Sequence, residues 1–447
     1  MREHDRLSGD DTRSYFPMTS YCSILGTDFV ASRSAMNFPR MASVRQKLAS
    51  DSLEDLPAAL GRALERAGFE RLIAPGQSVA LAVGSRNIDR LVEPVAELAR
   101  KLKDSGCSPF IVPAMGSHGG ATAEGQVRVL AGLGVTGESV GAPVVSSMEA
   151  VHLGVTQGGA EVFADRAACE ADAIVVVNRV APHTGYSGPI QSGLCKMIAV
   201  GLGKRDGAKS IHRHGFGAAH LIVEMAEVVL SEAPVVMGMA LIEDGEKKLS
   251  RLEVLRPEEF RIREPELLGD AISLYPRIPL ASADLLIVDE IGKDISGVGM
   301  DPLVTGRGKD TGPDEGAAFS TRRLVALRLT EGSGGNATGI GHADVTTERL
   351  VASMDREATK KNVITSGALH RARIPLVAGS DMEAVEMALE SLGDFSPDAA
   401  RIVRIKNTRT LGEFQVSRAL VAELNDREGV ETGEEGDMKF DSDGNII

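Results

Sequence analysis

Short apolar runs alternate with segments of helical periodicity in the first half of the chain. Residues 79–85 form an apolar run that ends in Gly84-Ser85, and residues 109–115 form one that is followed by Gly116-Ser117, which is typical of buried strands. Apolar residues recur every three or four positions over 91–105, and a further helix is predicted over 122–133. The order strand, helix, strand, helix is a βαβα unit, and it predicts a parallel sheet.

The same pattern continues to the end of the chain. Further strands are predicted at 172–180, 234–243, 283–290 and 401–406, and further helices at 53–67, 217–231, 264–274, 346–355 and 382–392. Residues 305–320 and 331–343 are Gly/Thr-rich and are predicted to be loops. We therefore expect an α/β protein of two domains with mainly parallel sheets.

The expected division of the chain follows from these elements. Residues 1–40 are polar without clear periodicity and are predicted to be a disordered extension, with initiation at Met41 as an alternative. The first α/β domain is predicted over 41–275 and the second over 276–425, followed by an acidic, mobile tail over 426–447.

Charge and cysteine content narrow the class of function. A formal net charge of −14 argues against nucleic acid and against anionic membrane surfaces as partners. The four cysteines are widely spaced without a CxxC pair, as expected of reduced cytosolic thiols. No apolar run is long enough for a membrane span, and no signal peptide is recognisable. We expect a cytoplasmic protein, and its oligomeric state stays open.

Reactive side chains follow several of the predicted strands. Arg86, His118, His183 and Lys293 each come after an apolar run, and the carboxyl ends of parallel strands meet at one edge of a sheet. Histidine is suited to acid–base work near neutral pH, and arginine to binding a carboxylate. The alternative is that each histidine only stabilises its Gly-rich turn and that Arg86 is a surface cation.

The segment 181–214 carries the densest group of such residues. Lys196 lies in an apolar setting, which would suit a nucleophile or an attachment point, or else a lysine that extends to the surface from a helix end. His212 and His214 form a His-x-His pair, which alone is a weak metal signal. The Gly-rich run 116–122 before a helix would also suit a phosphate.

Motifs from four loops resemble the nickel-pincer lactate racemase family over about 41–430. Ser85-Arg86 is similar to the Thr-Arg pair of the first loop, and Gly116-Ser-His118 is similar to the Gly-x-His of the second. His183, then Tyr186-Ser187-Gly188, then Lys196 follows the order of the third motif, and the metal ligand expected sixteen residues beyond the lysine is His212.

The resemblance implies a Rossmann-like N-terminal domain with the active site in the cleft between the two domains, and it also implies a cofactor and residue roles. Lys196 would be joined through a thioamide to a pyridinium bisthiocarboxylate mononucleotide that holds Ni(II), with His212 as the protein ligand to the metal. His118 and His183 would exchange the proton of the substrate hydroxyl, while Arg86 and Lys293 hold its carboxylate. Ser85, Arg86, Gly116, Ser187 and Gly188 would line the cofactor. The implied activity is a racemase or epimerase of a small anionic 2-hydroxy acid, supplied with cofactor by dedicated synthesis enzymes.

Two departures from the family pattern lie near the expected substrate. The interval from His183 to Lys196 is three residues longer than in the lactate enzymes, and Val83-Gly84 replaces the usual acidic residue before the Thr-Arg pair. We therefore expect a 2-hydroxy acid other than lactate, such as a sugar acid or a dicarboxylate.

Two other functions remain alternatives at this point. The first is a Zn- or Mn-dependent hydrolase with His212 and His214 as direct ligands and His183 as the base. The second is a homologue without catalytic activity that binds a hydroxy acid or a nucleotide as a sensor.

Overall fold

The computed structural model describes residues 37–85, 88–215, 218–307, 318–393 and 396–447. Pro39–Ile447 forms one compact unit. The expected extension over 1–40 lies outside the described residues except for its last four. The expected boundary between 275 and 276 stays a prediction, although each sheet draws its strands almost wholly from one side of it.

The first half of the chain builds a five-stranded sheet. Its strands lie in the order β3-β2-β6-β7-β8, and all neighbours are parallel except the last pair. The bounds are β2 Ser78–Val83, β3 Ser108–Pro113, β6 Ala173–Arg179, β7 Val235–Glu243 and β8 Leu249–Leu255. The expected parallel sheet is confirmed, and β8 is an addition that the sequence did not predict.

Both faces of this sheet are covered because its central strands are apolar on both sides. Ala80 and Ala82 of β2 belong to one hydrophobic cluster, and Val79 and Leu81 belong to another, as the alternation of side chains along a strand requires. The first cluster packs against α9 (Ala219–Glu232) and α10 (Pro257–Leu274), and the second against α1 (Leu56–Ala67) and α3 (Val92–Asp104). This is the layered arrangement of a doubly wound α/β fold.

Shorter elements complete this half of the chain. A hairpin of β4 (Ala150–Val155) and β5 (Glu161–Asp165) stands apart from the main sheet. The remaining bounds are α2 Phe69–Leu72, η2 Gly119–Ala121, α4 Ala123–Gly132, α5 Gly137–Val140, α6 Arg166–Cys169, α7 Leu194–Lys196, η3 Met197–Gly201 and α8 Lys204–Arg213.

The second half builds an eight-stranded sheet in the order β12-β11-β10-β9-β13-β14-β1-β15. The first five strands are parallel neighbours and the last four are antiparallel neighbours, with β13 common to both groups. The bounds are β1 Arg40–Gln46, β9 Ser282–Ile291, β10 Ser320–Leu329, β11 Val345–Thr347, β12 Leu376–Ala378, β13 Ile402–Asn407, β14 Thr410–Ser417 and β15 Val430–Asp437. Its helical elements are α11 Pro302–Thr305, η5 Glu331–Ser333, η6 Ile340–His342, α12 Glu348–Ala352, α13 Arg356–Ser366, η7 Leu369–Ala372, α14 Asp381–Glu390 and α15 Arg418–Asn425.

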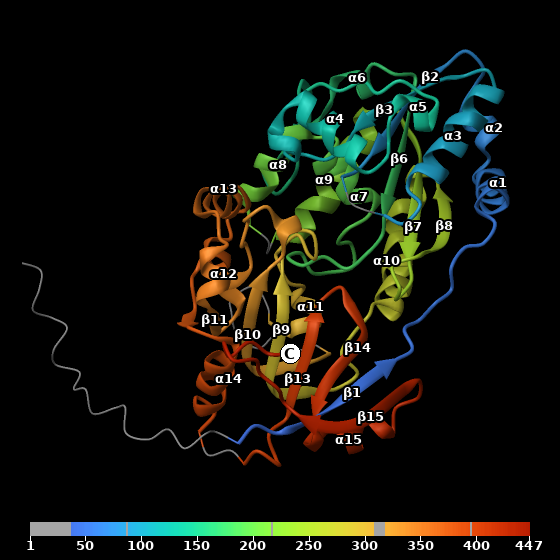
Figure 1. The fold of residues 1–447 in the computed structure, drawn as a ribbon. Helices are drawn as coiled ribbons and strands as arrows, with labels where there is room; N and C mark the ends of the chain where they lie inside the picture. The colour runs from blue at the N-terminus through green and yellow to red at the C-terminus, as the bar shows by residue number, and fades with distance from the viewer. Residues whose placement is uncertain (1–36, 86–87, 216–217, 308–317, 394–395) are drawn as a thin grey trace, which may run out of the picture. The chain divides into compact units, whose positions relative to one another are not determined.

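The two ends of the described chain meet in this second sheet. Strand β1 pairs antiparallel with both β14 and β15, and Figure 1 shows the blue strand between the two red ones. Part of the expected acidic tail over 426–447 is therefore a strand, and Arg40–Gln46, at the start of the expected first domain, pairs in the second sheet. Strand β15 could not be predicted from its acidic sequence, because an edge strand exposed to solvent has few apolar residues.

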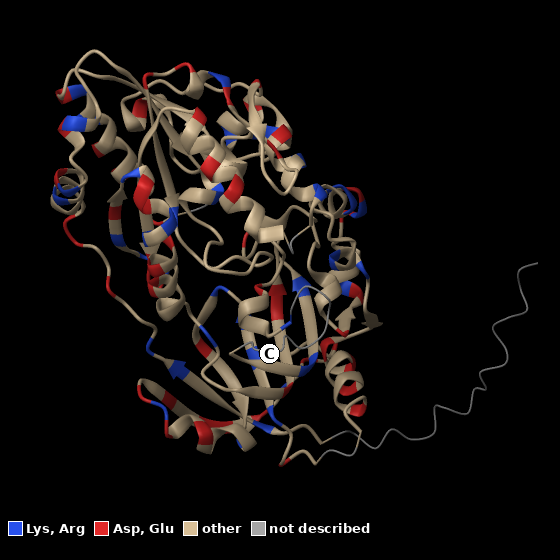
Figure 2. Cartoon of the chain, turned by 180° about the vertical axis from the view of Figure 1, so that it is seen from behind, with Lys and Arg blue, Asp and Glu red and all other residues tan. Residues whose placement is uncertain are grey.

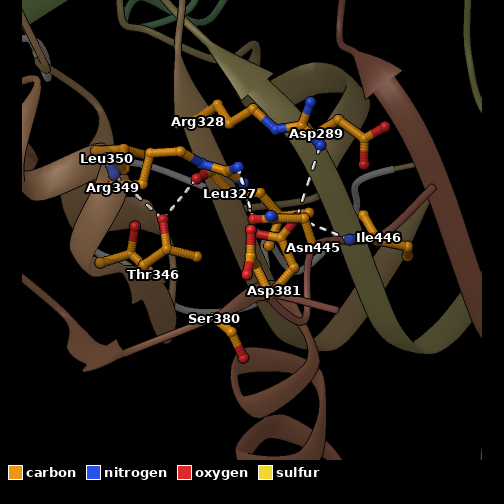
Figure 3. Close-up of polar contacts among 12 residues, drawn as sticks. Asp289, Leu327, Arg328, Thr346, Arg349, Leu350, Ser380, Asp381, Asn445 and Ile446 are labelled. Atoms are coloured by element: carbon orange, nitrogen blue, oxygen red, sulfur yellow. Dashed lines mark hydrogen bonds and ion pairs between the residues drawn. The ribbon is translucent and has the colours of Figure 1, made fainter. Parts of the chain in front are cut away.

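The last residues are fixed by a buried carboxylate. Asp381 is fully buried, and its oxygens accept hydrogen bonds from Arg349 (2.7 Å) and from the backbone N–H of Ile446 (3.1 Å). Arg349 also donates to Asn445 at 2.8 Å, so one guanidinium joins the carboxylate to the C-terminal turn (Figure 3).

Acidic and basic side chains are interspersed over the surface helices (Figure 2). None of the helices in the described part of the chain combines the length and the apolar character that a membrane crossing requires.

Candidate functional site

The site lies where the parallel strands of the five-stranded sheet end. Strands β2, β3, β6 and β7 are parallel neighbours, so the loops that follow them share one edge. These loops carry Ser85, His118, His183 and Lys247. Arg86, which was expected to bind both cofactor and substrate, lies outside the described residues.

Ser85 and His118 form the first contact between these loops. The Ser85 hydroxyl lies 2.5 Å from Nδ1 of His118, although the two residues are 33 positions apart. The contact orients the imidazole from its Nδ1 side. It also joins two residues that the sequence analysis had assigned to different loops of one site.

Gly116 supports the loop that carries His118. This glycine has φ of +60°, a conformation that favours glycine, and a Cβ atom would approach Ala208 and the Val200 carbonyl at 3.4 Å. Its N–H donates to the Gly201 carbonyl at 3.0 Å, and its own carbonyl accepts from the buried amide of Gln126 at 2.9 Å. Gly116 therefore packs against the segment that follows Lys196.

A buried ammonium ties the same loop to the helix that carries His212. Lys204, the first residue of α8, is fully buried, and its Nζ lies 2.8 Å from Oδ2 of Asp165. The same Nζ donates to the Pro113 carbonyl at 2.6 Å and to Gln126 at 3.2 Å. Burial lowers the pKa of Lys204, while the Asp165 charge acts against that shift. The sequence analysis missed this residue because a lysine is seldom buried without a partner, and the partner is 39 positions away.

His183 is fixed by the backbone of its own turn. Its Nδ1 accepts hydrogen bonds from the N–H groups of Gly185 and Tyr186, both at 2.9 Å, and its own N–H donates to Gln191 at 2.8 Å. Because Nδ1 accepts twice, a neutral imidazole in this arrangement carries its proton on Nε2. The ring of His183 thus offers a hydrogen-bond donor.

Lys196 ends the short helix α7, directly before the π-helical turn η3. Its ammonium lies 5.1 Å from the centre of the buried Tyr186 ring, which is within cation–π range. Such π-helical turns occur frequently at functional sites. Ser187 and Gly188, expected to line the cofactor, lie next to Tyr186 on the exposed part of the same turn.

Glu264 of α10 supports the start of α7. It is 1% exposed, and its Oε2 accepts a hydrogen bond from the Cys195 N–H at 2.9 Å. Burial raises the pKa of Glu264 to about 7. Gly193 leaves the room that this carboxyl needs, since a Cβ there would lie 2.1 Å from Oε1.

His212 lies near the end of α8 and is partly buried, whereas His214 follows the helix and is exposed. Burial lowers the pKa of His212, and the charge of Lys196 lowers it further. A neutral imidazole is the form that binds a metal. Among residues that the structure describes, no three His, Cys, Asp or Glu side chains are grouped so that they could hold a metal ion.

A cavity of about 510 Å³ opens beside these loops. Of the residues expected from the sequence, Ser85, His183 and Lys293 line it, whereas Gly116, His118, Ser187, Gly188, Lys196 and His212 do not. Lys293 follows β9, and its ammonium donates to the Gly297 carbonyl at 2.5 Å and to Asn362 at 3.2 Å.

The cavity adds polar residues that the sequence analysis did not select: Arg179, Glu243, Lys247, Tyr275, Asp301 and Arg409. Arg179 and Glu243 form an ion pair, and the Tyr275 hydroxyl donates to Asp301. One signal in the sequence pointed to Lys247, because it follows the fourth predicted strand of the same parallel sheet.

Comparison with known proteins finds a family match in the first part of the chain. Residues 32–220 match the lactate racemase N-terminal domain. No curated protein matches the chain. Among solved structures, the chain is similar to the lactate racemase apoprotein from Thermoanaerobacterium thermosaccharolyticum, with 15% identity and a TM-score of 0.49 over 82% of this chain and 94% of that chain.

Proposed function

We propose, on the premise that residues 32–220 are a lactate racemase N-terminal domain, that the chain is a cytoplasmic racemase or epimerase of a 2-hydroxy acid. In this proposal it uses a nickel-pincer nucleotide attached to Lys196. The observation that carries the proposal is that Lys196, 5.1 Å from the centre of the buried Tyr186 ring, and the partly buried His212 both lie within the segment that matches the lactate racemase N-terminal domain.

The residues present fit such a group. Lys196 is oriented by Tyr186 and by the support of α7 from Glu264. His212 offers one neutral nitrogen, and nitrogen with soft sulfur donors in a plane suits Ni(II). When bound, the cofactor would supply a reversible acceptor for the hydride of the substrate Cα. Gly116 and the exposed turn at Ser187 and Gly188 complete the set that would lie against it.

The acid–base work falls first to His118 in this proposal. In the tautomer in which Nδ1–H of His118 donates to the Ser85 hydroxyl oxygen, Nε2 is free to take the proton from the substrate hydroxyl. His183 donates a hydrogen bond from Nε2 to the substrate, and it can accept a proton only after Nδ1 leaves the N–H groups of Gly185 and Tyr186. Lys293 and Arg86 would bind the carboxylate.

Inversion of the configuration at Cα tests the proposed function. The protein is co-expressed with cofactor-synthesis enzymes and incubated separately with each of a panel of enantiopure 2-hydroxy acids. The chirality of the product is then followed. We expect one class of acid to lose its enantiomeric purity, and the His118→Ala variant to slow this by about 100-fold or more. Retained chirality of every acid, with nickel and cofactor present, would contradict the proposal.

A further inference from the structure

Lys247 is held in an unusual backbone conformation at the edge of the site. It lies in the turn between β7 and β8 and has φ of +63°, which L side chains rarely adopt. The buried carboxylate of Asp244 fixes this turn, because its Oδ1 accepts from the N–H groups of Glu246 and Lys248, both at 2.9 Å. Strain that the surrounding structure maintains in this way is typical of functional positions.

The ammonium of Lys247 lies over the ring of Tyr275, and both residues line the cavity. It lies 4.2 Å from the centre of the Tyr275 ring, and no described carboxylate forms an ion pair with it. The acidic groups nearby are otherwise engaged: Glu243 pairs with Arg179, and Asp301 accepts from the Tyr275 hydroxyl. Burial and the charge of Arg179 lower the pKa of Lys247, whereas the charges of Glu243 and Asp301 raise it.

A second cation lines the same cavity from the other sheet. Arg409 lies in the turn between β13 and β14, and its guanidinium donates to the backbone carbonyl of Asp294 at 3.2 Å. Asn407 fixes this turn by accepting from the N–H groups of Arg409 and Thr410, both at 3.0 Å. Counted over the described residues, the cavity has four basic side chains (Arg179, Lys247, Lys293 and Arg409) and three acidic ones (Glu243, Asp294 and Asp301).

We propose that Lys247 and Arg409 form a second anion subsite, so that the substrate is a 2-hydroxy dicarboxylate whose distal carboxylate they bind. The inference rests on the proposed function for the reaction at the first carboxylate, which Lys293 holds. A lysine at an apolar ring and an arginine with two parallel N–H donors recognise a carboxylate by charge-assisted hydrogen bonds. A monocarboxylate such as lactate leaves both cations without a counter-ion.

Calorimetric titration of the cofactor-free full-length protein tests the subsite. The probes are malate, which has two carboxylates, lactate, which has one, and gluconate, which has one and several hydroxyls. We expect malate to bind at least about tenfold more tightly than lactate or gluconate. Lys247→Met and Arg409→Gln should each weaken malate about tenfold and leave lactate unchanged. Lys248→Met is the matched control, because this neighbour is 56% exposed and lies near Asp89 instead of the cavity.

Several results would overturn the subsite. One is malate binding that equals lactate binding in the wild type, and another is malate affinity that both variants retain. Preference for gluconate, lost in Lys247→Met, would replace the dicarboxylate with a polyhydroxy acid. Since the titration needs no cofactor, failure of the nickel-pincer proposal would leave the binding result intact. The anion subsite and the nickel-pincer proposal can therefore fail independently. Unfolding midpoints of the variants exclude loss of fold as the cause of weaker binding.

Discussion

Lys196 and His212 lie close enough for the charge of the lysine to lower the pKa of the histidine, in addition to the larger effect of burial. They are joined by the π-helical turn η3 and by the buried start of α8 at Lys204. The arrangement keeps the imidazole neutral, which is the protonation state that a metal ligand needs. It also separates His212 from His214, two residues further on, which is exposed to solvent.

Replacement of His212 should therefore remove bound nickel, while replacement of His214 should not. We expect His212→Ala, co-expressed with cofactor-synthesis enzymes, to lose most of its nickel per chain, because the metal loses its protein donor. His214→Ala is the matched control and should retain nickel at the wild-type level. Elemental analysis of the purified proteins gives the ratio of nickel to protein chain. Equal loss in both variants would indicate that the His-x-His pair acts as a unit.

Lys204 should contribute strongly to stability, because its replacement leaves Asp165 buried without a counter-ion. Removal of one partner of a buried ion pair typically costs about 3–5 kcal/mol of unfolding free energy, so Lys204→Met should unfold at much lower denaturant concentration. Arg205→Met, at the exposed neighbouring position, should change stability by less than about 0.5 kcal/mol. The double variant Lys204→Met with Asp165→Asn should recover part of the loss. No recovery would argue against the ion pair as the origin.

Glu264 should make stability fall as the pH rises. Its folded pKa of about 7 lies above the usual value of 4.5, so the folded state holds a proton that the unfolded state has released. This contribution is complete below pH 4.5, declines as the pH rises toward 7 and is lost above it, and it amounts to about 3 kcal/mol.

Glu264→Gln tests this sign, since the amide cannot titrate. The free energy of unfolding of the variant, relative to that of wild type, should increase between pH 5 and pH 8. Denaturant unfolding at each pH measures this difference. Glu266→Gln, exposed on the same helix, serves as the control and should show no such trend. A wild-type minus variant difference that is constant with pH would refute the raised pKa.

The sequence predicts the part of the fold that depends on local pattern. The apolar runs at β2, β3, β6, β7 and β9 are buried on both sides, so their signal is strong, and the structure confirms these strands. Strand β10 (Ser320–Leu329) was not predicted, because charged Arg322 and Arg323 interrupt its apolar pattern, although it lies inside the sheet between β9 and β11. Strands β1 and β15 depend on pairing across nearly the whole chain, which no local pattern contains.

The residues of the candidate site also divide into those that the sequence predicts and those that it does not. Histidines and glycines in loops after strong strands can be found from sequence, because strand ends of a parallel sheet converge. Ser85 beside His118 follows from that logic. Other site residues depend on contacts between distant segments: Lys204 with Asp165, Glu264 with the start of α7, and Lys247 with Arg409. In the sequence these charged residues cannot be told from ordinary surface residues of the same types. Such residues become visible only once burial is known.

The attachment of a cofactor at Lys196 is the most direct test of the whole account. Intact mass spectra would be recorded for wild type, Lys196→Ala and Lys209→Ala, all co-expressed with cofactor-synthesis enzymes; Lys209 is the matched control, exposed on α8. We expect an adduct of cofactor size in wild type and in Lys209→Ala, and its absence in Lys196→Ala. An unmodified wild-type mass under these conditions, or an adduct that persists without Lys196, would contradict the account.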